Sequence, residues 1–360
     1  MKILCVIDGL GSGGAQRQLV ELAKGFKSKG HDVYFLVYYL QDFYKEDLDK
    51  AGISITSIIE PNYIKRLLRM RKFIRQGNYN SVLSFLGAAN FITTVSGLPN
   101  KKWKLVVGER SANPNILKSF KLRSYRWFHL FTDFIVANSH ANLELVKKAN
   151  PLLSRRKLKV IYNTVSHSSF NYRIKNKREP LHIVVGASHR YLKNSLLMAK
   201  ALNLLTELER SRLEISWFGD NISPPFFDGS FVETKKYIDA NNLNKVINFY
   251  PASKNLIKQI EEADVVALFS AYEGLPNTIC EALSLGKPVI CPNISDIPLI
   301  IKDQEQLFKV NDVFDLKRVF KFYLNISDAE YQNIGLHNQK SSSELFCPDK
   351  IIGQYLELLT

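Results

Sequence analysis

The sequence predicts an α/β protein built from two Rossmann-like, doubly wound domains. Short apolar runs of strand length alternate with longer stretches of helical periodicity, which is typical of parallel sheets with crossover helices. This series occurs twice, and an irregular basic segment at 166–180 separates the two halves as an exposed linker. At 360 residues, 46% of them hydrophobic, the chain is long enough to bury two separate cores.

Each half contains short apolar runs that we expect to form one sheet buried on both faces. In the first half the predicted strands are residues 2–7, 33–38, 81–85, 105–107, 134–137 and 159–161. In the second half they are residues 181–185, 214–218, 246–249, 265–269 and 289–291. A last helical pattern covers residues 350–359.

The most informative segment follows an apolar run in the second half. Glu273 comes just after the predicted strand, at the carboxyl end, where open α/β sheets bind their ligands. Pro276 suits the first position of a helix and Gly286 suits the residue past its last turn, which predicts a short helix at 276–285. Glu281 then lies one to two turns into that helix.

The start of this helix has the chemistry of a diphosphate site. The backbone N–H groups of Gly274, Leu275 and Asn277 lie where unpaired donors and the helix dipole favour an anion. The carboxylate of Glu281 has acceptor oxygens for two adjacent hydroxyls, such as those of a ribose. The alternative is structural, with Glu281 on an ordinary helix face and Glu273 capping a turn.

This segment resembles the Glu-x7-Glu signature of retaining glycosyltransferase family 4, in which an E-G-x-P-N turn and a second glutamate precede a G-x-P-V strand. The matching residues here are 273–277, Glu281 and 286–289, with further similarity at 13–15, 137–139 and 160–165. The resemblance covers most of the chain and extends to bacterial surface-polysaccharide and O-antigen transferases. It implies the GT-B fold, in which two Rossmann-like domains face each other across a cleft.

The resemblance also implies a role for each part of the chain. Residues 1–167 are expected to form a basic, membrane-facing domain that binds the acceptor. Residues 168–345 are expected to bind the nucleotide sugar, and residues 346–360 to form a helix that crosses back to the first domain.

A glycine-rich loop follows the first predicted strand. Its pattern from Gly9 to Gly14 matches G-x-G-x-x-G, which by itself is compatible with an NAD-binding oxidoreductase. Such a site also needs an acidic residue at the end of the second strand, where residues 38–41 are Tyr-Tyr-Leu-Gln. By resemblance, Gly13 and Gly14 let the backbone approach the donor's diphosphate or sugar. The alternative is a tight turn that needs glycine only for its conformation.

Two cations follow the first strand of the second half. Arg190 and Lys193 are expected at another strand carboxyl end, where they would neutralise a departing nucleoside diphosphate. Many members of the family carry the arginine five residues before the lysine, a position that Ser188 occupies here. A solvated helix entrance is the other interpretation of these residues.

The implied activity is retaining, metal-independent transfer of a sugar from a nucleoside-diphosphate sugar, UDP-linked in our prediction, to a lipid-linked saccharide. No cofactor is expected, and neither the four cysteines nor the seven histidines have the spacing of metal ligands. Glu273, Lys193 and Arg190 are the predicted catalytic residues. The residues predicted on the acceptor side are Asn90, Glu109, Arg110, Ser139 and His140. The alternatives are a nucleotide-sugar epimerase of the same fold and an inert subunit that recruits a partner to the membrane.

The positive charge of the chain lies in its first half. Residues 1–165 hold 27 Lys and Arg against 11 Asp and Glu, whereas residues 166–360 hold 22 against 23. Two basic segments with apolar residues, 65–75 and 118–127, are expected to dock on an anionic membrane surface. The basic residues are Lys65, Arg66, Arg69, Arg71, Lys72 and Arg75 in the first, and Lys118, Lys121, Arg123 and Arg126, beside Trp127, in the second. Solvated helices and nucleic-acid binding are alternatives, and we expect no nucleic acid partner.

The expected location is the cytoplasm, on the inner face of the cell membrane. The scattered cysteines are those of a reduced protein, and no apolar run reaches the length of a membrane span. The apolar run at the amino terminus is also too short for a signal peptide.

Overall fold

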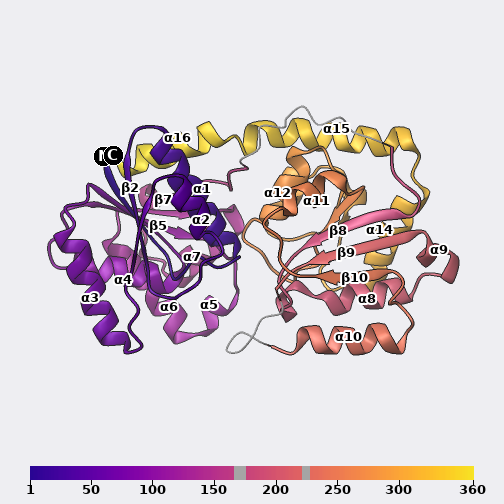
Figure 1. Cartoon of the computed structure of the whole chain (residues 1–360), viewed down its shortest axis with the longest axis horizontal. Coiled ribbons are helices and arrows are strands. Elements are labelled where there is room, and N and C mark those ends of the chain that lie inside the picture. The colour runs from indigo at the N-terminus through magenta and orange to yellow at the C-terminus, as the bar shows by residue number, and fades with distance from the viewer. Residues whose placement is uncertain (166–175, 221–227) are drawn as a thin grey trace. The chain divides into compact units, whose positions relative to one another are not determined.

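The computed structural model describes residues 1–165, 176–220 and 228–360, which form two compact units (Figure 1). The first unit comprises Met1–Ser166 and Phe346–Thr360, and the second comprises His167–Leu345. Each unit contains one sheet in which every strand pair is parallel (Figure 1). Two sheets of this kind confirm the predicted α/β class.

The first sheet has the strand order β3-β2-β1-β4-β5-β6-β7. Its strands are β1 (Lys2–Val6), β2 (Asp32–Val37), β3 (Ser54–Ser57), β4 (Ser81–Phe85), β5 (Lys104–Glu109), β6 (Phe134–Ala137) and β7 (Leu158–Val160). The helices are α1 (Gly14–Ser28), α2 (Lys45–Lys50), α3 (Tyr63–Gln76), α4 (Gly87–Gly97), α5 (Asn115–Lys118), α6 (Phe120–Trp127), η1 (Phe128–Phe131), α7 (His140–Ala149), η2 (Arg155–Lys157) and α16 (Pro348–Leu359). The strand order reverses between β1 and β4.

Both faces of this sheet are covered, which explains why its strands are apolar at successive positions. Along β1, Ile3 and Cys5 belong to a core cluster with α1 and α16, whereas Leu4 and Val6 belong to a cluster with α3, α4 and α7. Successive side chains of a strand point to opposite faces, so both sets must be hydrophobic.

The last helix, α16, packs on α1 in the first unit. Ile351, Ile352 and Tyr355 are buried in the core that α1 also lines. Gly25 of α1 permits the close approach, since a Cβ atom there would lie 2.2 Å from Cδ1 of Ile352. The backbone N–H of Val165 also donates to the carbonyl of Phe346 at 3.2 Å.

The second sheet has the strand order β10-β9-β8-β11-β12-β13, which reverses between β8 and β11. Its strands are β8 (Leu181–Gly186), β9 (Leu213–Phe218), β10 (Ile247–Tyr250), β11 (Val265–Ala267), β12 (Val289–Pro292) and β13 (Leu307–Phe308). The helices are η3 (Tyr191–Lys193), α8 (Ser195–Asn203), α9 (Glu207–Ser211), α10 (Ser230–Ala240), α11 (Leu256–Glu262), α12 (Asn277–Ser284), α13 (Ile297–Ile300), η4 (Gln304–Gln306), α14 (Val313–Asn325) and α15 (Asp328–Leu345). Figure 1 shows α11 and α12 on one face of this sheet and α8 and α10 on the other.

All eleven predicted strands are present, with ends shifted by up to two residues. The strands β3 and β13 were not predicted, because β3 is rich in serine and threonine at a sheet edge and β13 has only two residues. The predicted strand 265–269 is shorter than expected, since β11 ends at Ala267, although Leu268 and Phe269 beyond it are buried.

Residues 166–175 of the predicted linker at 166–180 lie outside the described residues. Of its described residues, 176 and 178–180 are exposed, as predicted, and Lys177 is half-buried. Side chains of this stretch nevertheless contact the second unit. The ammonium of Lys177 donates to the carbonyls of Tyr323 and Leu324 at the end of α14, and Arg178 pairs with Asp264 at 3.3 Å. Among the described residues, no helix combines the length and the apolar character needed to cross a membrane.

Candidate active site

The predicted catalytic residues Glu273 and Lys193 form an ion pair in the second unit. The ammonium of Lys193 donates to Oε1 of Glu273, and the two side chains are 20% and 15% exposed. Lys193 ends η3 after β8, whereas Glu273 follows β11, and these two strands are neighbours. Their carboxyl ends mark the point where the strand order reverses, which is where open α/β sheets bind ligands.

Backbone geometry holds the two loops together. The N–H of Ala271 donates to the carbonyl of Leu192 at 2.9 Å, which ties the Glu273 loop to the Lys193 turn. Asn194 follows with φ +58°, a left-handed conformation that asparagine tolerates, and this reverses the chain into α8. A backbone hydrogen bond between the two loops therefore helps to position the two side chains of the ion pair.

The helix after Glu273 begins one residue later than predicted. Pro276 has an extended ψ of 122° and is the N-cap, with its carbonyl accepting from the N–H of Cys280 at 3.2 Å. The helix ends at Ser284, one residue before the predicted end, and Gly286 lies just past it as predicted, with φ +66°, a conformation that only glycine adopts easily. Gly274 and Leu275, before the helix, are buried, and Asn277 is half-buried at its first position.

Glu281 lies four residues after Asn277, on the same face of α12 and one turn further. It is only 2% exposed. Thr278 of the same helix donates to the carbonyl of Gly186 at 3.0 Å, so α12 is fixed against the end of β8. Glu281 therefore lies one turn into the helix whose start is fixed at the strand end that leads to Lys193.

Sequence reasoning missed Ser295, which braces this site. Its hydroxyl donates to the carbonyl of Gly274, and its own backbone has φ +52°. Ser295 follows β12, so the site draws on the loops after β8, β11 and β12. The only signal in the sequence was its place just after a predicted strand.

Arg190 is exposed and lies near the phenol of Tyr272. Burial raises the pKa of Tyr272, and the positive charge of Arg190 opposes this rise. His189, next to it, is 4% exposed and packs among aromatic rings, and its burial lowers its pKa to about 4. At neutral pH the fixed positive charge of this turn therefore comes from Arg190 and Lys193, and His189 is uncharged.

The ends of β8 and β9 meet very closely beside this turn. A Cβ atom on Gly219 would lie 2.0 Å from the carbonyl oxygen of Ala187, so glycine is required by space. The indole of Trp217 donates to the same carbonyl at 2.7 Å.

In the first unit, Gly13 is the N-cap of α1 and Gly14 is its first residue. Among the described glycines with positive φ, none belongs to the loop 9–14. A conformational requirement therefore does not explain this loop. At Gly9 and Gly11 an added Cβ atom would lie 2.9 and 2.7 Å from Oε1 of Gln41, the end of an exposed, flexible side chain that can move away, so packing does not strictly require these glycines either.

The predicted acceptor-side residues lie at the ends of β4, β5 and β6 or just after them, and these strands are neighbours; Glu109 is the last residue of β5. Asn90 is fully buried, accepting from Ser84 at 2.9 Å and donating to the carbonyl of Gly108 at 3.0 Å. Ser139 is also buried and caps α7, accepting from the N–H of Asn142 at 3.1 Å. Both side chains have structural partners, and their contact with an acceptor stays a prediction.

Glu109 is 2% exposed and takes part in a buried ionic cluster. Its carboxylate lies 2.7 Å from Arg126 and 2.8 Å from His129. Arg110 stacks over the ring of Phe85, with its guanidinium carbon 4.7 Å from the ring centre. His140 is exposed at the start of α7. Of the five candidates, Arg110 and His140 keep the most accessible side chains.

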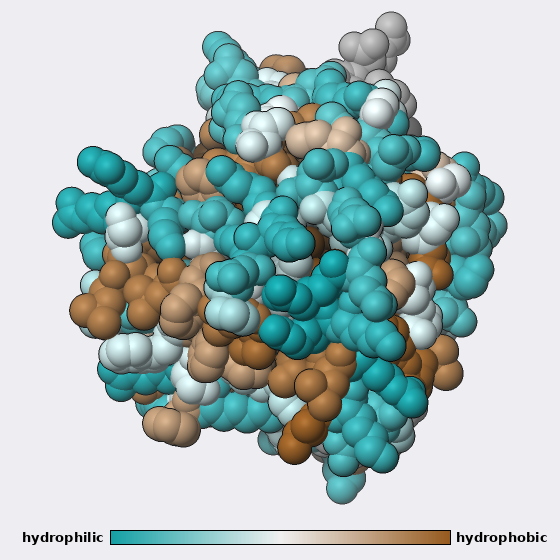
Figure 2. All heavy atoms as spheres, turned by 90° about the vertical axis from the view of Figure 1, so that its left-hand side faces the viewer, coloured by the Kyte–Doolittle hydropathy of each residue, from teal (hydrophilic) through white to brown (hydrophobic). Residues whose placement is uncertain are grey.

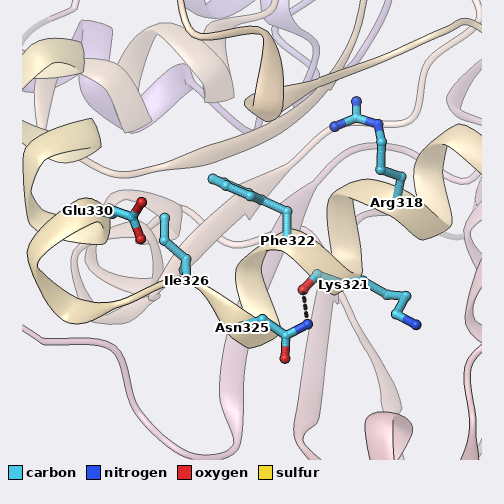
Figure 3. Close-up of a pocket in the computed structure, with 6 residues that line it drawn as sticks. All are labelled: Arg318, Lys321, Phe322, Asn325, Ile326 and Glu330. Carbon is cyan, nitrogen blue, oxygen red and sulfur yellow. Dashed lines mark hydrogen bonds between the residues drawn. The ribbon is translucent and has the colours of Figure 1, made fainter.

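A separate hollow of about 400 Å³ lies on the second unit, between the end of α14 and the start of α15 (Figure 3). Figure 3 shows the residues that line it, which are Arg318, Lys321, Phe322, Asn325, Ile326 and Glu330. Lys177, which precedes β8, binds the carbonyls at this end of α14. The hollow is therefore near the amino end of β8, the opposite edge from Glu273, and is not part of the site.

Two family models together match most of the chain. The model described as Glycosyltransferase Family 4 matches residues 12–169, and the model described as Glycosyl transferases group 1 matches residues 168–339. The strand-end region with Lys193, Glu273 and Glu281 falls in the second match.

Relatives with assigned activities cover much of the chain. A Campylobacter jejuni GalNAc-α-(1→4)-GalNAc-α-(1→3)-diNAcBac-PP-undecaprenol α-1,4-N-acetyl-D-galactosaminyltransferase is 22% identical, with 100% of this chain and 98% of the relative aligned. An N-acetylgalactosamine-N,N'-diacetylbacillosaminyl-diphospho-undecaprenol 4-α-N-acetylgalactosaminyltransferase of the same organism is 21% identical over 81% of this chain and 80% of its own length.

A solved structure supports the fold. The Anabaena HepE complex with UDP-glucose superimposes with a TM-score of 0.84 at 17% identity, covering 100% of this chain and 99% of HepE. With one family model matched in each half, the chain belongs to the GT-B glycosyltransferases of the family 4 and group 1 type.

Proposed function

We propose that this glycosyltransferase moves a sugar from a UDP-linked donor to a lipid-linked saccharide, with retention of the anomeric configuration and without a metal. The product would extend a cell-surface polysaccharide. The observation that carries the proposal is the Lys193–Glu273 ion pair at the reversal point of the second sheet. It joins a cation to a carboxylate beside the start of α12, where a diphosphate and a sugar would meet.

In this mechanism the bond between the anomeric carbon and the UDP oxygen breaks while the acceptor oxygen bonds to the same face of that carbon. The acceptor proton passes to the leaving phosphate oxygen. Lys193, Arg190 and the start of α12 stabilise the charge that develops on the diphosphate, which is the part a metal would otherwise play. Glu273 orients Lys193 and holds a hydroxyl of the transferred sugar, and Glu281 binds the ribose.

The choice of donor and acceptor draws on the relatives. HepE was solved with UDP and with UDP-glucose, and both Campylobacter relatives are named for acceptors linked through a diphosphate to undecaprenol. The basic first half of this chain suits such an anionic acceptor. We extend these features to this chain as part of the proposal.

The proposal is tested by nucleotide binding. UDP at 100 times its dissociation constant is expected to stabilise the protein by about 2.7 kcal/mol, measured as a higher Tm. GDP, ADP and NAD are expected to stabilise it less. Glu281→Gln is expected to lose this stabilisation, whereas Glu262→Gln, on the exposed end of α11, should keep it. Stabilisation by NAD alone would contradict the proposal. Turnover of a UDP-sugar without an acceptor would indicate an epimerase.

Membrane docking is a further part of the proposal, through a surface that differs from the one predicted by sequence. Arg71 and Arg75 of α3 do not face outward as predicted, because they donate to the carbonyls at the end of α4. Ile74 and Met70 are buried. The outward side of α3 has exposed Ile64 and Leu68 among its basic residues, which are Lys65, Arg69 and Lys72.

The second basic segment also has exposed apolar side chains. Phe120 is 89% exposed, and Trp127 is 41% exposed. Arg126 is buried with Glu109, which removes it from the predicted surface. Figure 2 shows the side of the first unit that carries α3, where hydrophobic side chains gather in patches among hydrophilic ones. Basic and apolar side chains mixed in this way suit an anionic lipid surface.

Replacing Lys65, Arg69 and Lys72 by glutamine is expected to weaken binding to vesicles containing anionic lipid by up to about 100-fold, since each cation near the surface contributes about 1 kcal/mol. Cosedimentation measures this. A matched control removes three exposed lysines of the second unit, at positions 236, 245 and 258. Equal losses in both variants would mean that net charge, and not α3, governs binding.

A further inference from the structure

Arg66 is a buried cation without an acidic partner. Its side chain is nine-tenths buried, and its Nε has no hydrogen-bond partner. In the described residues the rest of its guanidinium makes no hydrogen bond or ion pair either. The other arginines of α3 are paired, Arg69 with Glu60 at 3.3 Å and Arg71 and Arg75 with carbonyls of α4. Arg66 therefore differs from its neighbours on the same helix.

Three tyrosine rings hold the guanidinium in place. Its central carbon lies 4.9 Å from the ring centre of Tyr38, 5.4 Å from that of Tyr39 and 5.3 Å from that of Tyr63. Such contacts attract a cation, but they supply no acceptor for its N–H donors. The Nε–H is buried without an acceptor, which is costly, so the arrangement is suited to an anion that accepts from the guanidinium.

The tyrosines do not supply that anion. Burial raises the pKa of Tyr38 and raises the pKa of Tyr63 to about 12, so both phenols are neutral at physiological pH. The Tyr63 hydroxyl is also engaged with Tyr125 of α6. The positive charge of Arg66 is thus left for a ligand.

The position of this cluster fits a substrate. Tyr38 and Tyr39 follow the carboxyl end of β2, and their N–H groups both donate to the carbonyl of Asp8, at 2.9 and 2.7 Å. Asp8 leads from β1 into the glycine loop, so the cluster adjoins the reversal point of the first sheet. On its outer side, Tyr39 is 45% and Tyr63 is 38% exposed, so a ligand can reach the rings.

We propose that Arg66, framed by Tyr38, Tyr39 and Tyr63, binds a phosphate oxyanion of the acceptor through its planar fork of N–H groups. This assignment rests on the proposed function, because it takes the acceptor to be a saccharide joined to a lipid by a diphosphate. The guanidinium matches a phosphate in two parallel hydrogen bonds, which a lysine cannot form. The exposed tyrosine faces next to it offer apolar surface to a sugar ring.

The position of Ile64 on α3 suggests how a lipid-linked acceptor would be oriented. Ile64, 66% exposed, lies two residues before Arg66 on the outward side of α3. A lipid chain directed outward along Ile64 and a saccharide directed toward the glycine loop would place the connecting phosphates at Arg66.

Binding of farnesyl diphosphate and of inorganic pyrophosphate tests the site without requiring turnover. Isothermal titration of the wild-type protein is expected to show binding of farnesyl diphosphate, weakened about 10- to 100-fold in Arg66→Gln, the range for hydrogen bonds to charged groups. Arg156→Gln removes an exposed arginine of η2, outside both basic segments, and is the matched control. Arg66→Lys keeps the charge and should recover only part of the affinity.

The outcomes separate the sources of the phosphate and the two proposals. Much tighter binding of farnesyl diphosphate than of pyrophosphate identifies a lipid headgroup, whereas equal binding identifies a free phosphate. If the protein binds farnesyl diphosphate through Arg66 but transfers no sugar, the phosphate site is supported and the proposed function is wrong. Equal affinity in wild type and in a folded Arg66→Gln variant, with an unchanged Tm, would overturn the site.

Discussion

Replacing Glu273 by glutamine is expected to lower kcat about 100- to 1,000-fold, the usual effect of removing one group that stabilises a transition state. The substitution removes the charge that orients Lys193 and weakens the contact to the sugar hydroxyl. Steady-state transfer from a UDP-sugar measures the loss, and the Tm verifies the fold. Wild-type turnover in Glu273→Gln would contradict the role of the ion pair.

A double-mutant cycle separates this role from general damage to the pocket. Lys193→Met alone should also reduce kcat strongly. If the two side chains act as one unit, the double variant should be scarcely worse than either single variant. Glu262→Gln at the exposed end of α11 removes a carboxylate outside the site and should leave kcat unchanged. Fully additive losses would mean that the ion pair is not the functional unit.

Glu109→Gln is expected to destabilise the fold by about 3–5 kcal/mol, the cost of leaving a buried charge unpaired. Arg126 is 6% and His129 is 0% exposed, so neither can turn to water when the carboxylate is lost. Denaturant unfolding measures the change. Glu144→Gln on α7 is the control, because that carboxylate is exposed and 3.9 Å from its lysine partner. A change below about 1 kcal/mol would contradict the structural role, since that is the range of surface pairs.

The same cluster predicts a dependence of stability on pH. Burial works to raise the pKa of Glu109, but the charge of Arg126 and the hydrogen bond with His129 outweigh it and hold the pKa at about 2. The folded pKa is thus below the ordinary value of 4.5. The contribution of Glu109 is complete above pH 4.5 and is lost as the pH falls toward 2. The difference in unfolding free energy between wild type and Glu109→Gln should shrink over that interval.

Local patterns in the sequence predicted the strands and the short helix after Glu273 because these depend on neighbouring residues. Apolar runs define strands that are buried on both faces, and Gly286 ends α12 where its positive φ requires glycine. The edge strand β3 was missed since a sheet edge does not require apolar residues at successive positions. The start of α12 was misplaced by one residue, because proline is compatible with both the N-cap and the first helical position.

The basic segments show where local reasoning failed. By sequence, Arg71, Arg75 and Arg126 are indistinguishable from the other cations around them. The first two bind the carbonyls at the end of α4, and the third neutralises Glu109, which comes from a strand 17 residues earlier in the chain. Pairing of this kind depends on residues that are distant in sequence, so composition and helical periodicity do not reveal it.

By itself, the sequence determined the two doubly wound sheets and the identity of Glu273, Glu281 and Lys193 as site candidates, because strand periodicity and turn residues are local properties. Only the tertiary structure decided that Lys193 pairs with Glu273 and that Ser295 braces their loop. It also decided that Arg66 is buried among tyrosines without an acid. Strand order and packing bring these residues together, since a parallel sheet joins at one edge the loops of strands that are far apart in the chain.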